Sequence, residues 1–421
     1  MNKTHISTIG VVLIFIMCST FVAVPFDDDV YTSAEESDYA DDVADYTVYR
    51  NSSLKIINQS EMELYNQKSK YNLNEAIFVE SVIPHTPTKD IILIDSMWIN
   101  NNKSSTESNI SDLIKSGHPI ILLGDDSSSL KAKGVGTAFL AGGSVYGIYY
   151  DQNMDSVSCY SVIDCALESS ISYAYNWAVD AVENSNFEKT RATALDANSM
   201  KTYDLSSQPA KAGGSLPLGQ RVQSNADATC GSFGSVHIRT SYTEILSANP
   251  SKSYYLVEYS IQSVSSGGSK RTTGLRVMND VDKYLTEANL QDYGPTTSSG
   301  TTTVSLSGTV GAGWSAGGGP SVSGSFTWGW SYSTPDVIVI DNSNFGTDTL
   351  NIFHQIAADK NAAKNTYLAK PGAIFDGKKD SNGSYYYGVD IYTAEFRTQQ
   401  LFGYSGVSAY DLVCYVSVFS G

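Results

Sequence analysis

The sequence predicts two folded parts: a small α/β domain over residues 46–184 and an antiparallel β-sandwich over residues 236–421 that carries a long amphipathic β-hairpin. Three observations lead to this fold class. Predicted strands and helices alternate in the first part, whereas strands dominate the second. No charged residue lies between Asp292 and Asp336, although charged residues make up 17% of the chain. Three of the five tryptophans fall in that same interval.

The N-terminus has the pattern of a secretory signal over residues 1–24. Lys3 and His5 precede an apolar run that begins at Ile6, which predicts a secreted or extracellular protein. Two alternatives stay open, because the segment can be cleaved or can remain as an anchor at the cell surface. No later stretch reaches the roughly 18 apolar residues that a membrane-spanning helix needs, so any later contact with a bilayer has to use strands.

The charge of the chain is strongly acidic. The formal net charge is −17, which argues against nucleic acid as a partner because phosphates repel such a surface. Residues 25–45 contain nine acidic residues and no basic one. We expect a solvated, disordered spacer there rather than a cation-binding arm.

The first folded part alternates between the two kinds of element. Ser60 and Glu63 form a capping box that opens a helix. Four apolar runs in this part predict buried strands joined by short links. Such connections are right-handed and make the strands parallel, so we expect an open flavodoxin-like sheet. The predicted strands are 76–83, 90–99, 119–126 and 144–150, and the later helices are 108–117 and 166–182.

Acidic residues follow two of these strands. Asp95, Asp125 and Asp126 stand where open α/β sheets bind ligands, and paired aspartates can hold Mg²⁺. Aspartate after a strand is more often a turn or cap residue, and we favour that interpretation. The histidines show no triad or metal spacing; they are His5, His85, His118, His237 and His354. The sequence therefore predicts no enzyme, no metal site and no small-molecule cofactor.

Four cysteines remain once Cys18 is removed with the signal, and an even number in an exported chain makes disulfides plausible. Sequence cannot fix the connectivity. Proximity along the chain favours Cys159–Cys165 and Cys230–Cys414.

Residues 185–235 are rich in Ser, Ala, Gly and Gln with weak periodicity, and predict a linker or long loops. From His237 onward, alternating runs rich in tyrosine are separated by Gly, Asn, Ser or Pro turns. That spacing is typical of an antiparallel sandwich.

Within the uncharged interval the residues alternate with period two, which predicts a hairpin over residues 301–334. From 304 to 314 and from 322 to 332 the even positions are apolar or glycine, and the odd positions are Ser, Thr or Gly. The turn 316–320 (AGGGP) separates the two arms, and folding near Gly318 would pair Val304 with Tyr332 and Leu306 with Trp330.

One face of such a hairpin suits lipid and the other suits water. Each arm is long enough to cross an apolar band of about 25 Å even when tilted, but a single hairpin would leave unpaired edges in lipid, so several chains would have to close one barrel. The predicted membrane-facing residues are Val304, Leu306, Val310, Trp314, Val322, Phe326, Trp328, Trp330 and Tyr332. The predicted lumen-facing residues are Ser305, Ser307, Thr309, Ser323, Ser325 and Thr327. The alternative is a permanent sandwich hairpin with its apolar face inward.

Residues 292–341 resemble the stem region of the leukocidin/haemolysin family of β-barrel pore-forming toxins. Tyr293 and Pro295 match the turn that leads into the stem of that family, and Tyr332, Pro335 and Asp336 match the step that follows it. The stem here is shorter, and the α/β domain has no counterpart in short members of the family. The resemblance implies a secreted monomer that assembles as a homo-oligomer on the lipid membrane of a target cell and inserts its stems. The rival hypothesis is a cell-surface adhesive protein whose sandwich binds a partner without membrane insertion.

Overall fold

The computed structural model describes twelve parts of the chain. The predicted signal, the acidic spacer and the helix that begins at Ser60 lie outside them. The described residues are 54–57, 77–79, 91–96, 99, 110–165, 167–187, 218–245, 252–280, 288–296, 298–310, 324–380 and 383–420. Among them, no helix combines the length and apolar character required to cross a bilayer.

The first sheet runs through most of the chain in the order β2-β1-β3-β4-β6-β7-β8-β9-β10. Beyond β10 the sheet continues with β16 and β17, both paired to β10, and β12 pairs with β17. Its strands are β1 (Leu54–Ile57), β2 (Ile77–Val79), β3 (Ile91–Asp95), β4 (Ile120–Leu123), β6 (Val145–Asp151), β7 (Ser156–Ile163), β8 (Leu218–Thr229), β9 (Gly234–Ile245), β10 (Lys252–Ser265), β12 (Leu290–Gly294), β16 (Thr366–Ala369) and β17 (Gly372–Asp380).

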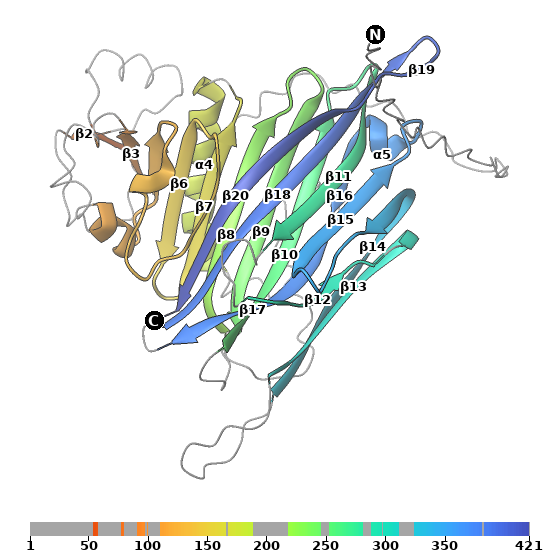
Figure 1. Cartoon of the computed structure of the whole chain (residues 1–421). Coiled ribbons are helices and arrows are strands. Elements are labelled where there is room, and N and C mark those ends of the chain that lie inside the picture. The colour runs from red at the N-terminus through yellow and green to blue at the C-terminus, as the bar shows by residue number, and fades with distance from the viewer. Residues whose placement is uncertain are drawn as a thin grey trace, which may run out of the picture. The chain divides into compact units, whose positions relative to one another are not determined.

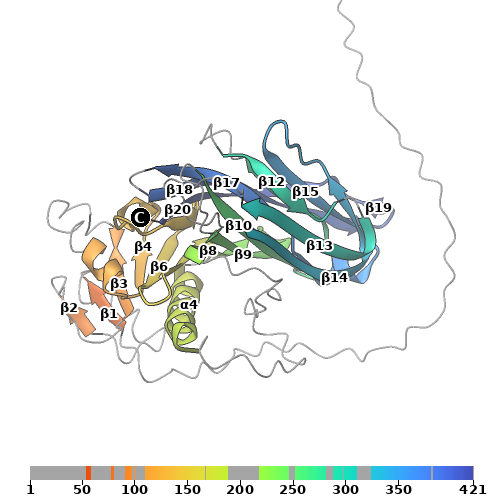
Figure 2. The same ribbon diagram turned by 90° about the horizontal axis from the view of Figure 1, so that it is seen from below.

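The second sheet has the order β5-β20-β18-β11-β15-β14-β13 and packs against the first (Figures 1 and 2). A hairpin between β17 and β18 joins the two sheets, and the short strand β19 returns along the end of β18. Its strands are β5 (Thr137–Leu140), β11 (Lys270–Asp280), β13 (Ser298–Val310), β14 (Gly324–Asp341), β15 (Thr349–Ile356), β18 (Gly383–Gln400), β19 (Gly403–Tyr404) and β20 (Ser408–Ser420). The labelled helices are η1 (Ser127–Ser129), α4 (Leu167–Phe187) and α5 (Asn361–Lys364), and the described residues 110–115 are also helical.

The antiparallel sandwich predicted for the second half is confirmed, but the flavodoxin-like domain is not supported. Strands β1 to β4 are parallel to one another, as predicted, but β4 pairs in the antiparallel direction with β6. Strands β6 and β7 then form an antiparallel hairpin, and β7 pairs in parallel with β8. This pairing makes the N-terminal strands a continuation of the sandwich sheet. Only α4 covers their other face among the described helices, through residues such as Ala174 and Ala178 (Figure 2).

The predicted linker over 185–235 is wrong in its last part, because Leu218–Thr229 is the strand β8. The side chains that β8 turns into the core are small, which is why its periodicity is weak in the sequence. Val222, Ser224, Ala226 and Ala228 are all buried. A strand that places small residues inward contributes little to an apolar pattern, although it is central to the sheet.

The two predicted disulfides are wrong, since all four cysteines are free thiols in the structure. Cys159 lies on β7, which stays extended to Ile163 before Cys165 follows. Four extended residues already separate two Cα atoms by about 13 Å, whereas a disulfide needs about 4.4–6.8 Å. Cys414 contacts the hydroxyl of Ser224 at 3.5 Å, and five extended residues of β8 lie between Ser224 and Cys230. The same argument therefore excludes the second bridge.

A buried carboxylate joins the two layers of the sandwich. Asp390 of β18 is fully buried and accepts hydrogen bonds from side chains of both sheets. The donors are Tyr242, Asn279, Tyr259 at 3.0 Å and Tyr392 at 3.1 Å. Burial raises the pKa of Asp390 to about 6, although these hydrogen bonds act in the opposite direction. The cluster fixes the register between layers at the cost of desolvating a carboxylate.

We expect Asp390 and His354 to give opposite pH dependences of stability. The pKa of Asp390 is higher in the folded state than its usual 3.8, so its contribution favours folding increasingly as the pH falls from about 6 to about 4. Burial lowers the pKa of His354 from 6.5 to about 4, so its contribution is lost as the pH falls from about 6.5 to about 4. Each shift corresponds to about 3 kcal/mol.

Urea unfolding of matched variants separates the two groups. Between pH 7 and pH 4, the unfolding free energy of the wild type should rise by about 3 kcal/mol relative to Asp390→Asn. Over the same range it should fall by about 3 kcal/mol relative to His354→Gln. A difference between wild type and variant that does not change with pH would contradict the assignment for that residue.

Candidate functional site

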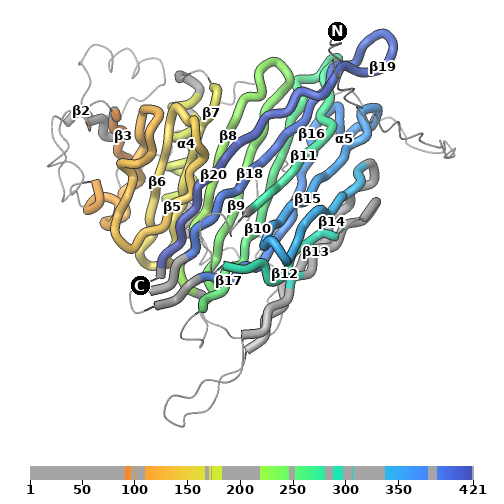
Figure 3. Tube along the Cα trace, in the orientation of Figure 1, coloured from red at the N-terminus to blue at the C-terminus, as the bar shows by residue number. Residues whose placement is uncertain are grey.

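The hairpin predicted in the uncharged interval is present as β13 and β14, which lie at the edge of the second sheet (Figures 1 and 3). The first arm runs from Ser298 to Val310 and the second from Gly324 to Asp341. The absence of proline and charge between residues 298 and 310, and the many β-branched and aromatic residues, suit an extended ladder. Residues 311–323, which include the predicted turn 316–320, lie outside the described residues.

The register of the hairpin differs by two residues from the predicted one. Val304 pairs with Trp330 rather than Tyr332, and Leu306 pairs with Trp328 rather than Trp330. An even shift leaves every even-numbered residue opposite an even-numbered residue, whereas an odd shift would have exchanged the two faces. The predicted division into an apolar and a polar face is therefore preserved by the observed register.

The structure places the predicted residues along both arms. Trp314, Val322 and Ser323 lie outside the described residues. On β13 are Val304, Ser305, Leu306, Ser307, Thr309 and Val310, and on β14 are Ser325, Phe326, Thr327, Trp328, Trp330 and Tyr332. Leu306 is the residue of this set whose side chain is described, and it is fully buried. Since β13 contacts β12 and β17, the apolar face is turned toward the body of the protein at this point.

The hairpin is bonded to the rest of the sheet only near its root. β14 pairs with β15 from Val337 to Asp341, and β13 pairs with β14 alone among the described strands. From Gly324 to Thr334, β14 likewise has β13 as its one partner within the described part of the chain. Within the described part of the chain, the arms therefore form a two-stranded ribbon whose outer edges pair with no other strand. Ladder bonds contribute roughly 1 kcal/mol each, so separating this ribbon from the sandwich costs few of them.

The root contains an irregularity that divides β14 into two segments. Ser299 pairs with Ile338, but the next residue, Gly300, pairs with Thr334. Residues 335–337 of β14 therefore have no pairing partner on β13. Pro335 stands in this segment and has no N–H to donate to a ladder. Such irregularities bend a strand, so the ribbon and the sandwich part of β14 meet at a natural hinge.

A hydrogen bond ties the strand before the hairpin to the end of the hairpin's second arm. The hydroxyl of Tyr293 on β12 donates to Oδ2 of Asp341 at 3.1 Å, and the Tyr293 ring lies 5.1 Å from that of Phe345. Partial burial, and then the neighbouring Asp341 carboxylate, raise the pKa of Tyr293. Asp348 accepts a bond from the N–H of Leu290 at 2.9 Å. Sequence reasoning identified Tyr293 but missed Asp341, which nothing in the local pattern marks.

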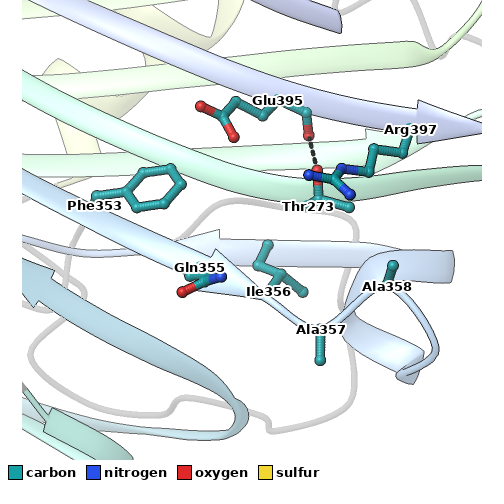
Figure 4. Close-up of a pocket in the computed structure, with 8 residues that line it drawn as sticks. All are labelled: Thr273, Phe353, Gln355, Ile356, Ala357, Ala358, Glu395 and Arg397. Carbon is teal, nitrogen blue, oxygen red and sulfur yellow. Dashed lines mark hydrogen bonds between the residues drawn. The ribbon is translucent and has the colours of Figure 1, made fainter. Parts of the chain in front are cut away.

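A shallow pocket borders the hinge on the outer side of the second sheet (Figure 4). Ile356, at the end of β15, pairs with Val337 directly after the hinge. The pocket has a volume of about 240 Å³ and is lined by Thr273, Phe353, Gln355, Ile356, Ala357, Ala358, Glu395 and Arg397. The Thr273 hydroxyl donates to the backbone oxygen of Glu395 at 3.4 Å (Figure 4), and the Arg276 guanidinium lies over the Phe353 ring at 5.1 Å. We assign the pocket no chemistry of its own.

The aspartates at the strand ends act as turn residues where their side chains are described. Asp126 caps η1 by accepting from the N–H of Ser128 at 2.8 Å and from its hydroxyl at 2.6 Å. Asp95 ends β3, and its side chain lies outside the description. The described residues contain no group of three or more His, Cys, Asp or Glu side chains arranged for a metal ion.

One row of side chains has the order of a hydrolytic triad. Ser235 lies 3.3 Å from Nε2 of His237, and Nδ1 of His237 contacts Asp227. A hydrolase would also need N–H groups free to hold an oxyanion. β9 is an interior strand, and Ser235 is paired with Thr229 on one side and Val264 on the other. The backbone N–H groups around Ser235 are therefore used in the sheet. We interpret the contacts among Ser235, His237 and Asp227 as structural and not catalytic.

Comparison with known proteins gives weak structural similarity. No family model matches the chain, and no curated protein matches it. Among solved structures, the chain is similar to a "pore forming protein" with a TM-score of 0.29 and 12% identity, over 48% of this chain and 95% of that one. For the delta-toxin of Clostridium perfringens the TM-score is 0.26, with 9% identity over 47% of this chain and 88% of the toxin. For the NetB toxin of the same organism, in its membrane-inserted form, the TM-score is 0.24, with 7% identity over 47% of this chain and 95% of the toxin.

These matches cover about half of this chain. The likeness of residues 292–341 to the leukocidin/haemolysin stem therefore remains a resemblance.

Proposed function

We propose that this chain is an exported pore-forming protein that assembles on a lipid membrane and inserts residues 301–334 of several copies into one closed β-barrel. The observation that carries the proposal is the state of the hairpin. It is an uncharged ribbon with alternating apolar and polar residues, it is bonded to the sandwich near its root, and its apolar face is turned inward at Leu306.

A ribbon of this kind has two environments available to it. Against the protein, the apolar face is partly covered, and the outer edges are open. In a membrane, lipid covers the apolar face and the neighbouring copies pair the edges, so that every backbone group within the hydrocarbon is satisfied. Serine and threonine on the odd face then line a wet lumen without an ionic barrier.

The length of the ribbon fits this role. The first arm is extended from Gly300 to Val310, and each residue adds about 3.3 Å. Eleven residues tilted by about 40° rise about 28 Å, which is enough for the roughly 25 Å apolar band of a barrel.

Release of a trapped dye from liposomes tests the function. Purified chain without the signal should empty the vesicles in a concentration-dependent manner, and detergent-resistant oligomers should appear only when lipid is present. An adhesive protein would bind a surface and leave the vesicles intact. Intact vesicles at concentrations where the chain is bound to them would refute pore formation.

A further inference from the structure

The hairpin between β18 and β19 exposes two large apolar side chains at its tip. Leu401 is 90% exposed and Phe402 is 91% exposed. Gln400 pairs with Gly403, so these two residues form the turn itself. Most other exposed apolar side chains of the described residues keep about half of their surface covered, whereas this tip is covered almost nowhere.

The conformation of the turn does not require these residue types. Gly403 has a φ of +91° and supplies the left-handed position that the turn needs. Turn positions are ordinarily occupied by Gly, Asn, Asp, Ser or Pro, which bond their own backbone or adopt turn dihedrals at low cost. Leu–Phe offers neither advantage and exposes apolar surface to water. A binding role for the tip accounts for both residues.

The tip is held rigidly by its base. Arg271 of β11 donates from Nη2 to Gln399 at 2.5 Å and from Nη1 to the backbone oxygen of Gly268 at 2.7 Å. The N–H of Gln399 donates to the oxygen of Ser269 at 2.7 Å, and the N–H of Thr398 donates to the hydroxyl of Ser405 at 2.9 Å. The β10–β11 turn therefore supports the β18–β19 hairpin, and the exposed side chains lose little freedom on binding.

The tip shares one end of the sandwich with the root of the ribbon. Ser265, before the β10–β11 turn, donates its N–H to the oxygen of Asn365 directly after α5. β15 leads into α5, and its last residue, Ile356, pairs with Val337 at the hinge. Figure 1 shows β19 and α5 at the end opposite the C-terminus. The sandwich part of β14 points, from Asp341 to Val337, toward the end that holds β19 and α5. A ribbon that straightened at the hinge would extend in that direction.

The charge at this end differs from that of the whole chain, which carries −17. The segments that meet here are 230–233, 266–270, 357–365 and 399–404. They contain one acidic residue, Asp359, against three lysines, which are Lys270, Lys360 and Lys364, and Asp164 lies close to Cys230 at the same end. Lysines behind an apolar tip suit the headgroup region of a bilayer, where anionic lipids attract them while apolar side chains enter the acyl boundary.

We infer that Leu401 and Phe402 form a wedge that docks this end of the sandwich on a lipid bilayer and so positions the root of the ribbon above the membrane. The inference rests on the proposed pore function, whose first step it specifies. A second copy of the chain is a poorer occupant. Two side chains bury roughly 300–400 Å², whereas a stable protein interface buries about 1,000 Å² or more.

Flotation with liposomes tests the wedge. The double variant Leu401→Ser/Phe402→Ser should bind phosphatidylcholine vesicles at least about 100-fold more weakly than the wild type, with an unchanged thermal midpoint. Addition of phosphatidylserine should strengthen binding of both proteins. The matched control is Met154→Ser, because Met154 is an exposed apolar residue on the β6–β7 turn at the other end of the sheet. It should bind as the wild type does.

The outcomes separate the wedge from the pore. A double variant that binds and releases dye like the wild type overturns the wedge and leaves pore formation standing. A wild type that binds through the tip but releases no dye refutes the pore and leaves the wedge standing. A wild type that self-associates without lipid, and loses this association in the double variant, shows that a second copy occupies the tip and overturns the inference.

Discussion

Removal of the ribbon should abolish dye release and leave the sandwich folded. Gly300 and Thr334 face each other across the ladder, so the chain between them can be replaced by the dipeptide Asn–Gly, which closes a two-residue hairpin. The arms beyond this pair are bonded to each other and not to other described strands. We therefore expect far-ultraviolet circular dichroism typical of strands, a thermal midpoint within a few degrees of the wild type, and no leakage at any concentration that binds vesicles.

The same deletion discriminates between the two interpretations of the hairpin. If the ribbon is a permanent part of the core, its removal exposes the surface that covers Leu306 and the protein aggregates or melts far below the wild type. A deletion that folds and still empties vesicles would show that another segment opens the membrane, and the assignment of residues 301–334 would be wrong. Vesicle flotation of the deleted protein serves as the control, because the wedge at Leu401 and Phe402 is intact.

Charge on the even face of the ribbon should abolish leakage, and the same charge on the odd face should not. Val310→Lys places an ammonium at the end of β13 on the predicted lipid side, and such a charge in the apolar band costs about 2–4 kcal/mol for each copy in the barrel. Ser307→Lys adds the same charge to the predicted lumen. The Ser307→Lys variant should still release dye. The selectivity of its channel should shift toward anions, which the reversal potential in a planar bilayer measures.

Both substitutions lie on β13 within three residues of each other, so general effects on expression or charge are matched. Binding to vesicles should be equal for the two variants, since neither is at the docking tip. Equal loss of leakage in both, or loss in Ser307→Lys alone, would exclude a barrel in which even positions meet lipid. A cross-strand disulfide between Ser307→Cys and Thr327→Cys, which are paired in the structure, checks that the register persists after insertion.

The sequence alone was sufficient to predict the hairpin and its two faces. Period two in apolar residues and the absence of charge over 43 positions are local properties, and a strand turns alternate residues to opposite faces whatever surrounds it. The sandwich strands followed for the same reason, because their runs are long and bounded by turn residues. The buried strands at 91–95 and 120–123 were also predictable from continuous apolar runs.

What the local pattern could not supply was which segments pair. The sequence did not predict β8, because the side chains that it turns inward are small. Since β8 pairs in parallel with β7, the segment expected to form a separate domain is part of the sandwich sheet. The cysteines were paired wrongly because nearness in sequence does not imply nearness in space along an extended strand. The docking tip could not be found either, since Leu401 and Phe402 read like any other apolar pair.

For this protein, the sequence by itself determined the alternation of the ribbon and its lack of charge. The tertiary structure decided that the ribbon lies at an edge, that its ladder breaks at residues 335–337, and that Tyr293 meets Asp341 at its root. The physical reason is the range of the interactions. Alternation follows from the geometry of neighbouring residues in one strand, whereas edges, hinges and exposed tips exist only relative to segments that are distant along the chain and are brought together by burial of the common core.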